Sequence, residues 1–319
     1  MHLRNVAIFC DVVTHGSFSK AAEAHEVSQS SASQAVNMLE RRLGCKLIDR
    51  SKRPFELTPA GQIYYDGCRK ILESFRHVED RVQQMRNKVI GRVRMAAIYS
   101  VGLLQMDAYA KRYKALYPDV ALELEYLHPD EVYSRVLNDE ADLGIVSFPR
   151  VGGEIASTPW QNQEMVLVVP PGHRHTAVSS LGHGYAAGPH LAEPSIPVQA
   201  LNGETFVGFT SELTIRKQID RWFKQERISV DLVHVFDNVE NIKRAVEIGS
   251  GVALLPAPTV RREVEAGLLH AVHLEGVAWQ RPLGIVHRRN RTLTNPARKL
   301  VELLRKSLES VATSGSEKV

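Results

Sequence analysis

Polar side chains gather at one end of a short amphipathic stretch near the start of this chain. Gln29, Ser30, Ser33 and Gln34 carry amide and hydroxyl groups that can form hydrogen bonds. Side chains of this kind, exposed at the N-terminal end of a helix, can read base edges in the major groove of DNA. The alternative is the ordinary polar face of a small helical domain, and these residues alone leave both interpretations open.

Two short helices separated by a tight turn are predicted over 18–43, and they would hold these side chains outward. In the second helix the apolar residues recur at spacings that place them on one face: Ala32, Val36, Leu39 and Leu43. Ser28 precedes this run, where its hydroxyl can cap free backbone N–H groups. A further helix is expected over 3–14 with Gly16 as its stop, and Ser17 or Ser19 can cap the helix after it. The pattern is that of a helix-turn-helix.

A basic hairpin is predicted after these helices. Residues 47–48 and 55–57 look like short strands around a basic tip that runs from Arg50 to Pro54. Beside a helix-turn-helix such a hairpin is a wing, whose arginine can enter the minor groove. The alternative is a solvated loop. Residues 1–91 hold 14 Lys and Arg against 10 Asp and Glu, whereas the remainder holds 26 of each, so the whole positive excess lies where phosphate contacts are expected.

A long helix is expected from Thr58 and Pro59 onward. Its apolar residues repeat at alternating spacings of four and three, which is a heptad seam: Tyr64, Cys68, Ile71, Phe75, Val78, Val82, Met85 and Val89. Self-association as a coiled coil is favoured, and packing against the helix's own domain is the alternative. A dimer would present two recognition helices to a two-part operator.

From Arg92 onward, strands and helices alternate. Strands are expected over 93–97, 120–124, 143–146, 164–169, 206–209, 230–236 and 252–255, with helices over 102–117, 130–138, 212–226, 239–248 and 295–311. The order strand–helix–strand predicts a largely parallel sheet with ligand crevices at the C-terminal ends of the strands. Two adjacent α/β units of this size predict a cleft between lobes that can close on a ligand.

The enzyme motifs considered are incomplete or missing in this sequence. His25-Glu26 lacks the second histidine of a zinc-protease helix, and Gly249-Ser250-Gly251 lacks the third glycine of a dinucleotide fingerprint. There is no nucleophile elbow and no phosphate-binding loop. We therefore predict that the protein is not an enzyme and needs no cofactor. One irregular segment holds histidines that could bind a metal, although exposed loop histidines are the favoured interpretation: His173, His175, His183 and His190.

Cysteine spacing and hydropathy indicate the cellular compartment of the protein. Cys10, Cys45 and Cys68 have no paired spacing, so buried free thiols are expected rather than a disulfide or a Cys-based zinc site. The first residues form no signal peptide, and no run approaches ~18 apolar residues. A cytoplasmic protein without a membrane partner is predicted.

With these parts in this order, the chain resembles the LysR-type bacterial transcriptional regulators over nearly its whole length. The most specific portion is GSFSKAAEAHEVSQSSASQAVNMLERRLGCKLIDRSKRPFELTPAGQ, followed by YPDVALEL, NDEADLGIVS and VEIGSGVALLP. The resemblance implies a winged helix-turn-helix, a coiled-coil linker helix and a two-lobed α/β effector-binding domain of the periplasmic-binding-protein type. It also implies a homodimer through the long helix, usually a tetramer, that acts on RNA polymerase.

The expected domain boundaries follow from this resemblance. The DNA-binding domain is placed at 1–58, the dimerisation helix at 59–91 and the effector-binding domain at 92–311, with a disordered tail at 312–319. The lobes exchange strands, so lobe I is expected at about 92–161 and 269–311, and lobe II at about 162–268.

The family's DNA contacts, carried over by position, fall on Gln29, Ser30, Ser33, Gln34, Arg50, Arg53, Thr58 and Gly61. Two positions depart from the family pattern, which commonly has Pro at Ser30 and a basic residue at Gln34. Glutamine can bind adenine in a bidentate way whereas arginine favours guanine, so the operator preference is not carried over.

The family's effector pocket falls on Tyr99, Ser100, Val101, Ser147, Phe148, Thr210, Ser211 and Asn238. Hydroxyls and helix N-termini that converge there suit a small anion such as a carboxylate or sulfate, although each residue could be an ordinary cap or turn residue. Segment 173–203 is longer than in the family. The prediction is a sequence-specific regulator of transcription that binds double-stranded operator DNA and a small-molecule effector. The α/β half alone also resembles a solute-capture receptor.

Overall fold

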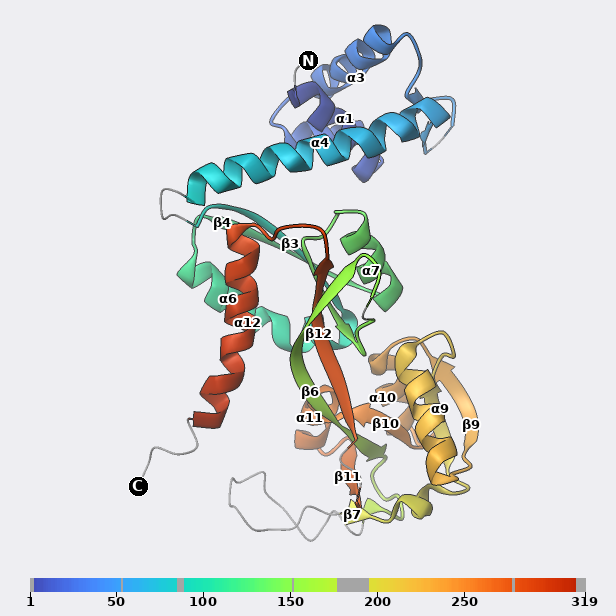
Figure 1. Cartoon of the computed structure of the whole chain (residues 1–319). Helices are drawn as coiled ribbons and strands as arrows, with labels where there is room; N and C mark the ends of the chain where they lie inside the picture. Colours follow the sequence, from blue (N-terminus) through green and yellow to red (C-terminus); the bar gives the residue numbers. More distant parts are fainter. Residues whose placement is uncertain are drawn as a thin grey trace. The chain divides into compact units, whose positions relative to one another are not determined.

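The computed structural model describes residues 3–52, 54–84, 89–150, 152–176, 195–276 and 279–313. The chain divides into a helical unit, Met1–Lys88, and an α/β unit, Val89–Val319 (Figure 1). Among the predicted features, Arg53, Met85, His183, His190 and the tail from residue 314 lie outside the described residues.

Three helices build the core of the helical unit: α1 (Leu3–His15), α2 (Phe18–Ala24) and α3 (Gln29–Leu43). Ser17 Oγ accepts a hydrogen bond from Lys20 N, and Ser28 Oγ accepts one from Ser31 N, so both helix caps follow the prediction. The predicted apolar stripe of α3 is buried only as far as Leu39. Leu43 is 39% exposed, because α3 ends there at Gly44, which has a φ of +69°.

The predicted hairpin and long helix follow. Strand β1 (Ile48–Asp49) pairs antiparallel with β2 (Glu56–Leu57), and Ile48 lies opposite Leu57. Helix α4 (Pro59–Gln84) then leaves the hairpin. Tyr64 and Cys68, the first two heptad residues, pack into the core of the helical unit, whereas the heptad residues from Ile71 to Val82 do not. The first part of the heptad seam therefore packs inside the helical unit, whereas the later part is exposed.

The first lobe of the α/β unit has the strand order β4-β3-β5-β12-β6. Strands β3 (Gly91–Ile98), β4 (Val120–Leu127) and β5 (Leu143–Ser147) run parallel, whereas β12 (Gln280–Arg288) pairs antiparallel with both β5 and β6 (Ile155–Val169). The prediction of a largely parallel sheet is therefore wrong where β12 and β6 enter. The lobe also contains α5 (Tyr99–Val101), the π-helix η1 (Gly102–Met106), α6 (Asp107–Leu116), α7 (Pro129–Leu137) and α12 (Asn295–Thr313).

The second lobe is built around the C-terminal end of β6. Residues 165–169 of β6 pair antiparallel with β10 (Ala253–Pro256) and β11 (His270–Leu274), and β7 (Ser195–Ile196) extends β11. Strand β8 (Thr205–Phe209) pairs parallel with β9 (Asp231–Phe236) and bridges to Val252. Helices of this lobe are η2 (Val198–Leu201), α9 (Thr214–Glu226), α10 (Val239–Glu247) and α11 (Ala257–Glu265).

Two stretches of chain connect the lobes. Strand β6 carries the chain from the first lobe into the second, and residues between β11 and β12 bring it back (Figure 1). The return comes after Leu274, later than the predicted boundary at 269, because β11 still pairs with the second-lobe end of β6. Helix α12 completes the first lobe: Trp160 Nε1 donates to Leu304 O over 3.0 Å, and Tyr113 donates to Pro296 O over 2.7 Å.

The cysteines and the helices test two further expectations. Cys10 and Cys68 are buried and outside any disulfide, as expected, but Cys45 is exposed because it follows Gly44 in the turn after α3. Within the described ranges, every helix is too short or too polar to cross a membrane.

Candidate functional site

The polar side chains at the start of α3 are open to solvent. Gln29, Ser30 and Gln34 are exposed, and Ser33 is half-buried. Arg50 reaches from the hairpin back to α3, where its guanidinium donates to Ser33 Oγ over 3.4 Å and to Asn37 Oδ1 over 2.9 Å. The start of α3 and the base of the hairpin therefore form one polar surface.

Aromatic contacts fix the hairpin against α2. The guanidinium of Arg50 lies 5.1 Å from the ring centroid of Phe18, and the Phe18 and Phe55 rings are 5.5 Å apart. Cation–π and aromatic pairs of this geometry stabilise the contact beyond the area they bury. The hairpin is thus held in place relative to α3.

Thr58 and Gly61 hold the start of α4. Thr58 Oγ1 donates to Lys46 O over 2.7 Å and accepts from Gly61 N over 2.9 Å. A Cβ atom on Gly61 would lie 1.9 Å from Leu47 O, so a larger residue would displace the backbone there. Both residues have a structural role in this geometry, and a DNA contact by Thr58 stays a prediction.

Glu40, which the sequence did not single out, anchors the chain between α3 and the hairpin. Its side chain is 4% exposed. Oε1 accepts from Leu47 N over 2.9 Å and from Ile48 N over 3.2 Å, and Oε2 lies 3.1 Å from Lys46 Nζ. Burial acts to raise the pKa of this carboxyl, but the hydrogen bonds from the two amides and the Lys46 ammonium outweigh burial and lower it. The carboxylate therefore stabilises the hairpin in its ionised form.

We expect Glu40→Ala to lower the free energy of unfolding at pH 7 by about 1–3 kcal/mol, because two buried N–H groups lose their acceptor. The folded-state pKa is depressed, so this stabilisation is complete above the unfolded pKa, about 4.3, and disappears as the pH falls through the folded value. Urea denaturation at pH 7 and at acid pH checks both statements. Glu56→Ala is the control, since Glu56 is 59% exposed and pairs with an exposed lysine. Equal losses in the two variants would contradict this role of Glu40.

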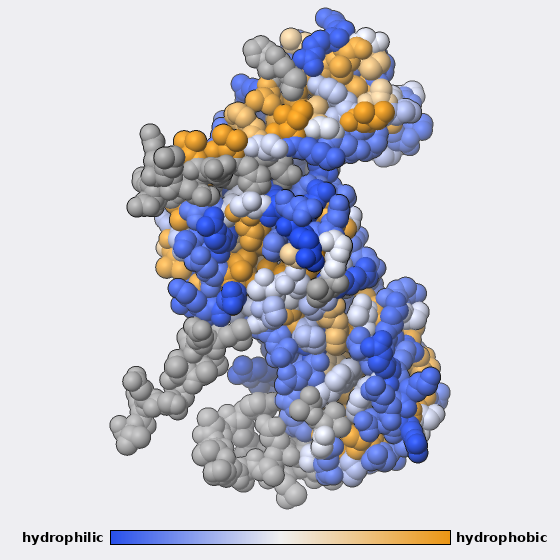
Figure 2. Space-filling view, in the orientation of Figure 1, coloured by the Kyte–Doolittle hydropathy of each residue, from blue (hydrophilic) through white to orange (hydrophobic). Residues whose placement is uncertain are grey.

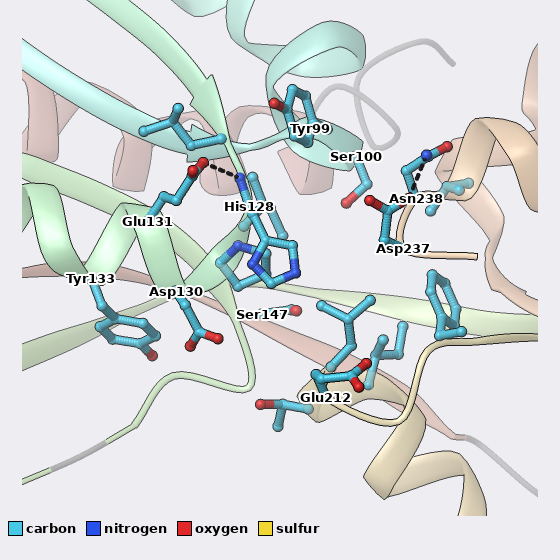
Figure 3. Close-up of a pocket in the computed structure, with 18 of the residues that line it drawn as sticks. Tyr99, Ser100, His128, Asp130, Glu131, Tyr133, Ser147, Glu212, Asp237 and Asn238 are labelled. Atoms are coloured by element: carbon cyan, nitrogen blue, oxygen red, sulfur yellow. Dashed lines mark hydrogen bonds between the residues drawn. The ribbon is translucent and has the colours of Figure 1, made fainter. Parts of the chain in front are cut away.

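A cavity of about 520 Å³ opens in the α/β unit where the two lobes meet. First-lobe residues come from the ends of β3, β4 and β5, and second-lobe residues come from the ends of β8 and β9. Tyr99 and Ser100 face Asp237 and Asn238 across it (Figure 3). The cavity has the size of an ordinary small-molecule site and lies at the C-terminal strand ends, as the sequence pattern predicted.

The eight residues predicted to bind an effector divide evenly. Tyr99, Ser100, Ser147 and Asn238 line the cavity. The other four do not: Val101 is fully buried in the first-lobe core, Phe148 packs against the second-lobe core, Thr210 is half-buried and Ser211 is exposed beside Glu212. Neighbours in sequence therefore differ in whether they reach the cavity: Ser100 lines it, whereas Val101 packs in the first-lobe core.

Arg281 also lines the cavity, and it is one of several lining residues that the sequence did not indicate. It lies near the start of β12, where the chain re-enters the first lobe, and is 2% exposed. Nη1 donates to Ser100 Oγ over 3.0 Å, and Nε and Nη2 donate to Gln163 Oε1. Burial lowers its pKa to about 9, and within the described parts of the chain no carboxylate offsets that burial. The group stays cationic at neutral pH, and among the described residues no carboxylate forms an ion pair with it.

Five carboxylate side chains also line the cavity. The cavity lining includes Asp130, Glu131, Glu212, Asp237 and Glu240. Asp130 pairs with Arg150 over 2.9 Å, and Glu240 pairs with Lys243 over 2.9 Å. Asp237 Oδ1 accepts from Asn238 Nδ2 over 2.8 Å (Figure 3). The cavity therefore combines one buried cation with an acidic rim, which a pocket for highly charged anions would not have.

Two family models cover almost the whole chain. The bacterial regulatory helix-turn-helix protein of the lysR family matches residues 3–62, and the LysR substrate binding domain matches residues 86–309. The chain belongs to the LysR family. It is a LysR-type transcriptional regulator, with a DNA-binding helix-turn-helix domain followed by an effector-binding domain.

Relatives and solved structures agree with this family. A protein of Cyanophora paradoxa named "Probable RuBisCO transcriptional regulator" is 28% identical over 93% of this LysR-family chain and 89% of its own length. A full-length OxyR variant from Pseudomonas aeruginosa matches with a TM-score of 0.70 and 22% identity, covering 97% and 95% of the two chains. Full-length CbnR in complex with its target DNA matches with a TM-score of 0.62 and 19% identity, covering 96% and 100%. These likenesses confirm the predicted fold.

Proposed function

We propose that this LysR-type regulator binds a two-part operator as a homodimer and reads bases with the exposed start of α3. The observations that support this are the polar side chains of α3, their link to Arg50 and the positive excess of the first 91 residues. The proposed DNA contacts are Gln29, Ser30, Ser33 and Gln34 to bases, Arg53 at the wing, and Arg50 and Thr58 near the DNA backbone.

The exposed part of the heptad seam supports the dimer. Ile71 is 50% exposed, Phe75 45%, and Val78 and Val82 58% each. Figure 2 shows the resulting hydrophobic surface over the C-terminal half of α4. Apolar side chains repeating at heptad spacing bury this surface by pairing with a second copy of the helix. We further propose that two dimers form a tetramer, that the regulator works in the cytoplasm, and that it acts on RNA polymerase at the promoter.

We expect Gln29→Ala to weaken operator binding by about 1–3 kcal/mol while binding to random DNA changes little, because an amide that reads a base edge contributes only to specific binding. Fluorescence anisotropy at two salt concentrations with both DNAs measures the difference. Gln225→Ala, an exposed glutamine of the α/β unit, is the matched control. An equal loss on both DNAs would argue against base reading by Gln29.

We propose that the cavity between the lobes binds the effector and that Arg281 anchors its anionic group. A buried guanidinium without a carboxylate partner is costly in the ligand-free protein, and an anion between Arg281 and Ser100 would compensate it. The acidic rim disfavours a second negative charge. We therefore propose an effector with one anionic group and a cationic or hydroxyl-bearing remainder that meets Asp237 and Glu212.

The mechanism we propose is a change in lobe closure. Effector contacts to both walls of the cavity favour a closed arrangement, and closure changes the spacing of the DNA-binding pairs across the assembly. Altered spacing changes DNA bending, and hence polymerase access.

A panel of small molecules tests the effector class. We expect amino acids and hydroxylated monocarboxylates to raise the melting temperature of the full-length protein more than dicarboxylates, phosphates or simple amines, since binding to the folded state raises its stability. Differential scanning fluorimetry at fixed ligand concentration gives the ranking. Greater stabilisation by dicarboxylates or phosphates would show that the rim does not select against extra charge.

A further inference from the structure

His173, His175 and Glu204 meet in the second lobe, away from the residues that line the effector cavity. The histidines lie just after β6, and Glu204 lies between η2 and β8. The prediction of exposed loop histidines is wrong for His173 and His175, whose side chains are 19% and 11% exposed. The side chain of Glu204 is 8% exposed.

The three side chains have the spacing of a metal-ligand set. His173 Nε2 lies 3.5 Å from Glu204 Oε2, and His175 Nε2 lies 2.8 Å from Glu204 Oε1. One ligand atom from each residue lies within 4.8 Å of the others. Donors bound to one zinc ion at about 2.0–2.2 Å are roughly 3–3.5 Å apart, so small side-chain movements would suffice.

The backbone holds these ligands from both sides. His173 N donates to Pro170 O over 3.3 Å, which closes a turn after β6, and Asp231 N donates to Glu204 O over 2.8 Å, which ties Glu204 to β9. A ligand that joined them would connect the segment after β6 to the β8–β9 edge of the lobe. Two imidazoles and one carboxylate are a borderline-soft set that suits zinc and similar divalent ions.

Competing contacts at this cluster are weak or movable. Arg174 donates to Glu204 Oε1 over 2.6 and 3.0 Å, but its side chain is 62% exposed and can turn into solvent. His175 N donates to His173 Nδ1 over a long 3.4 Å. Metal binding at His173 Nε2 would move the ring proton to Nδ1, so that this long contact and the 3.5 Å contact of Nε2 with Glu204 would be exchanged for coordination.

We propose that His173, His175 and Glu204 form a binding site for a divalent transition-metal ion of the zinc class. Three protein ligands leave at least one coordination position for water or another donor. Because the ion would bind the folded lobe and not the unfolded chain, it would raise the stability of the protein.

The test uses untagged full-length protein that has been stripped of metal with a chelator. We expect Zn²⁺ to raise the melting temperature and to bind with one high-affinity site per chain by calorimetry, and we expect Co²⁺ to give a visible absorption spectrum. His173→Ala and His175→Ala should each weaken Zn²⁺ binding by at least about tenfold and remove the Co²⁺ spectrum. His234→Ala, an exposed histidine of the same lobe, is the matched control and should behave as wild type.

Glu204→Gln supplies a second check of the ligand set. It keeps the hydrogen-bonding capacity of the side chain but removes its charge, so it should also weaken Zn²⁺ binding. Circular dichroism confirms that each variant is folded, and only folded variants are compared. Wild-type protein that binds neither Zn²⁺ nor Co²⁺ would overturn the proposal, as would histidine variants that bind as wild type does. Either result would make the cluster a purely structural ion-pair network around Glu204.

Discussion

Replacing Arg281 and Gln163 together by methionine should abolish the effector response while leaving the ligand-free protein about as stable as the wild type. The double change removes a buried cation without an anionic partner together with the acceptor it binds. Exchanging buried charged and polar groups for apolar residues of similar volume is often neutral or stabilising. Loss of the charge should weaken effector binding by about 2–5 kcal/mol, roughly 30-fold or more.

Single variants separate the two parts of this prediction. Arg281→Met alone leaves Gln163 Oε1 without its donor and should lower stability by about 1–3 kcal/mol, in addition to losing the response. Arg150→Met is the matched control, since Arg150 also lines the cavity but is exposed and paired with Asp130. Thermal shift and calorimetry with the strongest ligand of the panel give both quantities. A double variant that still binds this ligand with wild-type affinity would remove Arg281 from the site.

The double substitution Ile71→Asp/Val78→Asp should convert the protein to monomers. The two residues belong to the exposed heptad stripe of α4, where a charge on each of two facing helices would be buried beside its own copy. The second half-site would then no longer bind as part of the same molecule, so operator affinity should fall by about 10²–10⁴-fold. Light scattering measures the mass, and anisotropy measures the affinity.

Ser74→Asp is the control for the added charge, because Ser74 is exposed on α4 outside the heptad stripe. It should leave both mass and operator affinity nearly unchanged. An unchanged mass in the Ile71→Asp/Val78→Asp protein would refute pairing through α4, and it would leave the effector-binding proposal intact because that proposal rests on other residues.

Structural features with local sequence signals could be predicted. Ser17 and Ser28 cap the helices that they precede, as predicted, so the helix-turn-helix could be predicted nearly residue by residue. The C-terminal strand ends likewise converge as the alternation of strands and helices indicated. For the helix caps, the deciding hydrogen bond lies within three residues along the chain.

Segments whose structure depends on distant partners could not be predicted from the sequence. Strand β12 contains Arg281, Pro282 and Gly284, which do not read as a buried strand, and it pairs with β5 and β6, both more than a hundred residues earlier. Strand β6 begins at Ile155, before the predicted start at Glu164, because its polar middle pairs with β12. Glu40 and Arg281 were overlooked for the same reason: a charged residue is normally read as exposed, and only tertiary contacts show its burial.

The late position of β12 and α12 has a consequence for synthesis on the ribosome. The second lobe is nearly continuous from the end of β6 to Leu274, so its strands can pair while the chain is still being made. The first lobe needs β12 between β5 and β6, and α12 over Trp160 and Tyr113, before its sheet and core are complete. The edge of β5 therefore stays unpaired until β12 has been made, and the cavity that holds Arg281 can form only after that point.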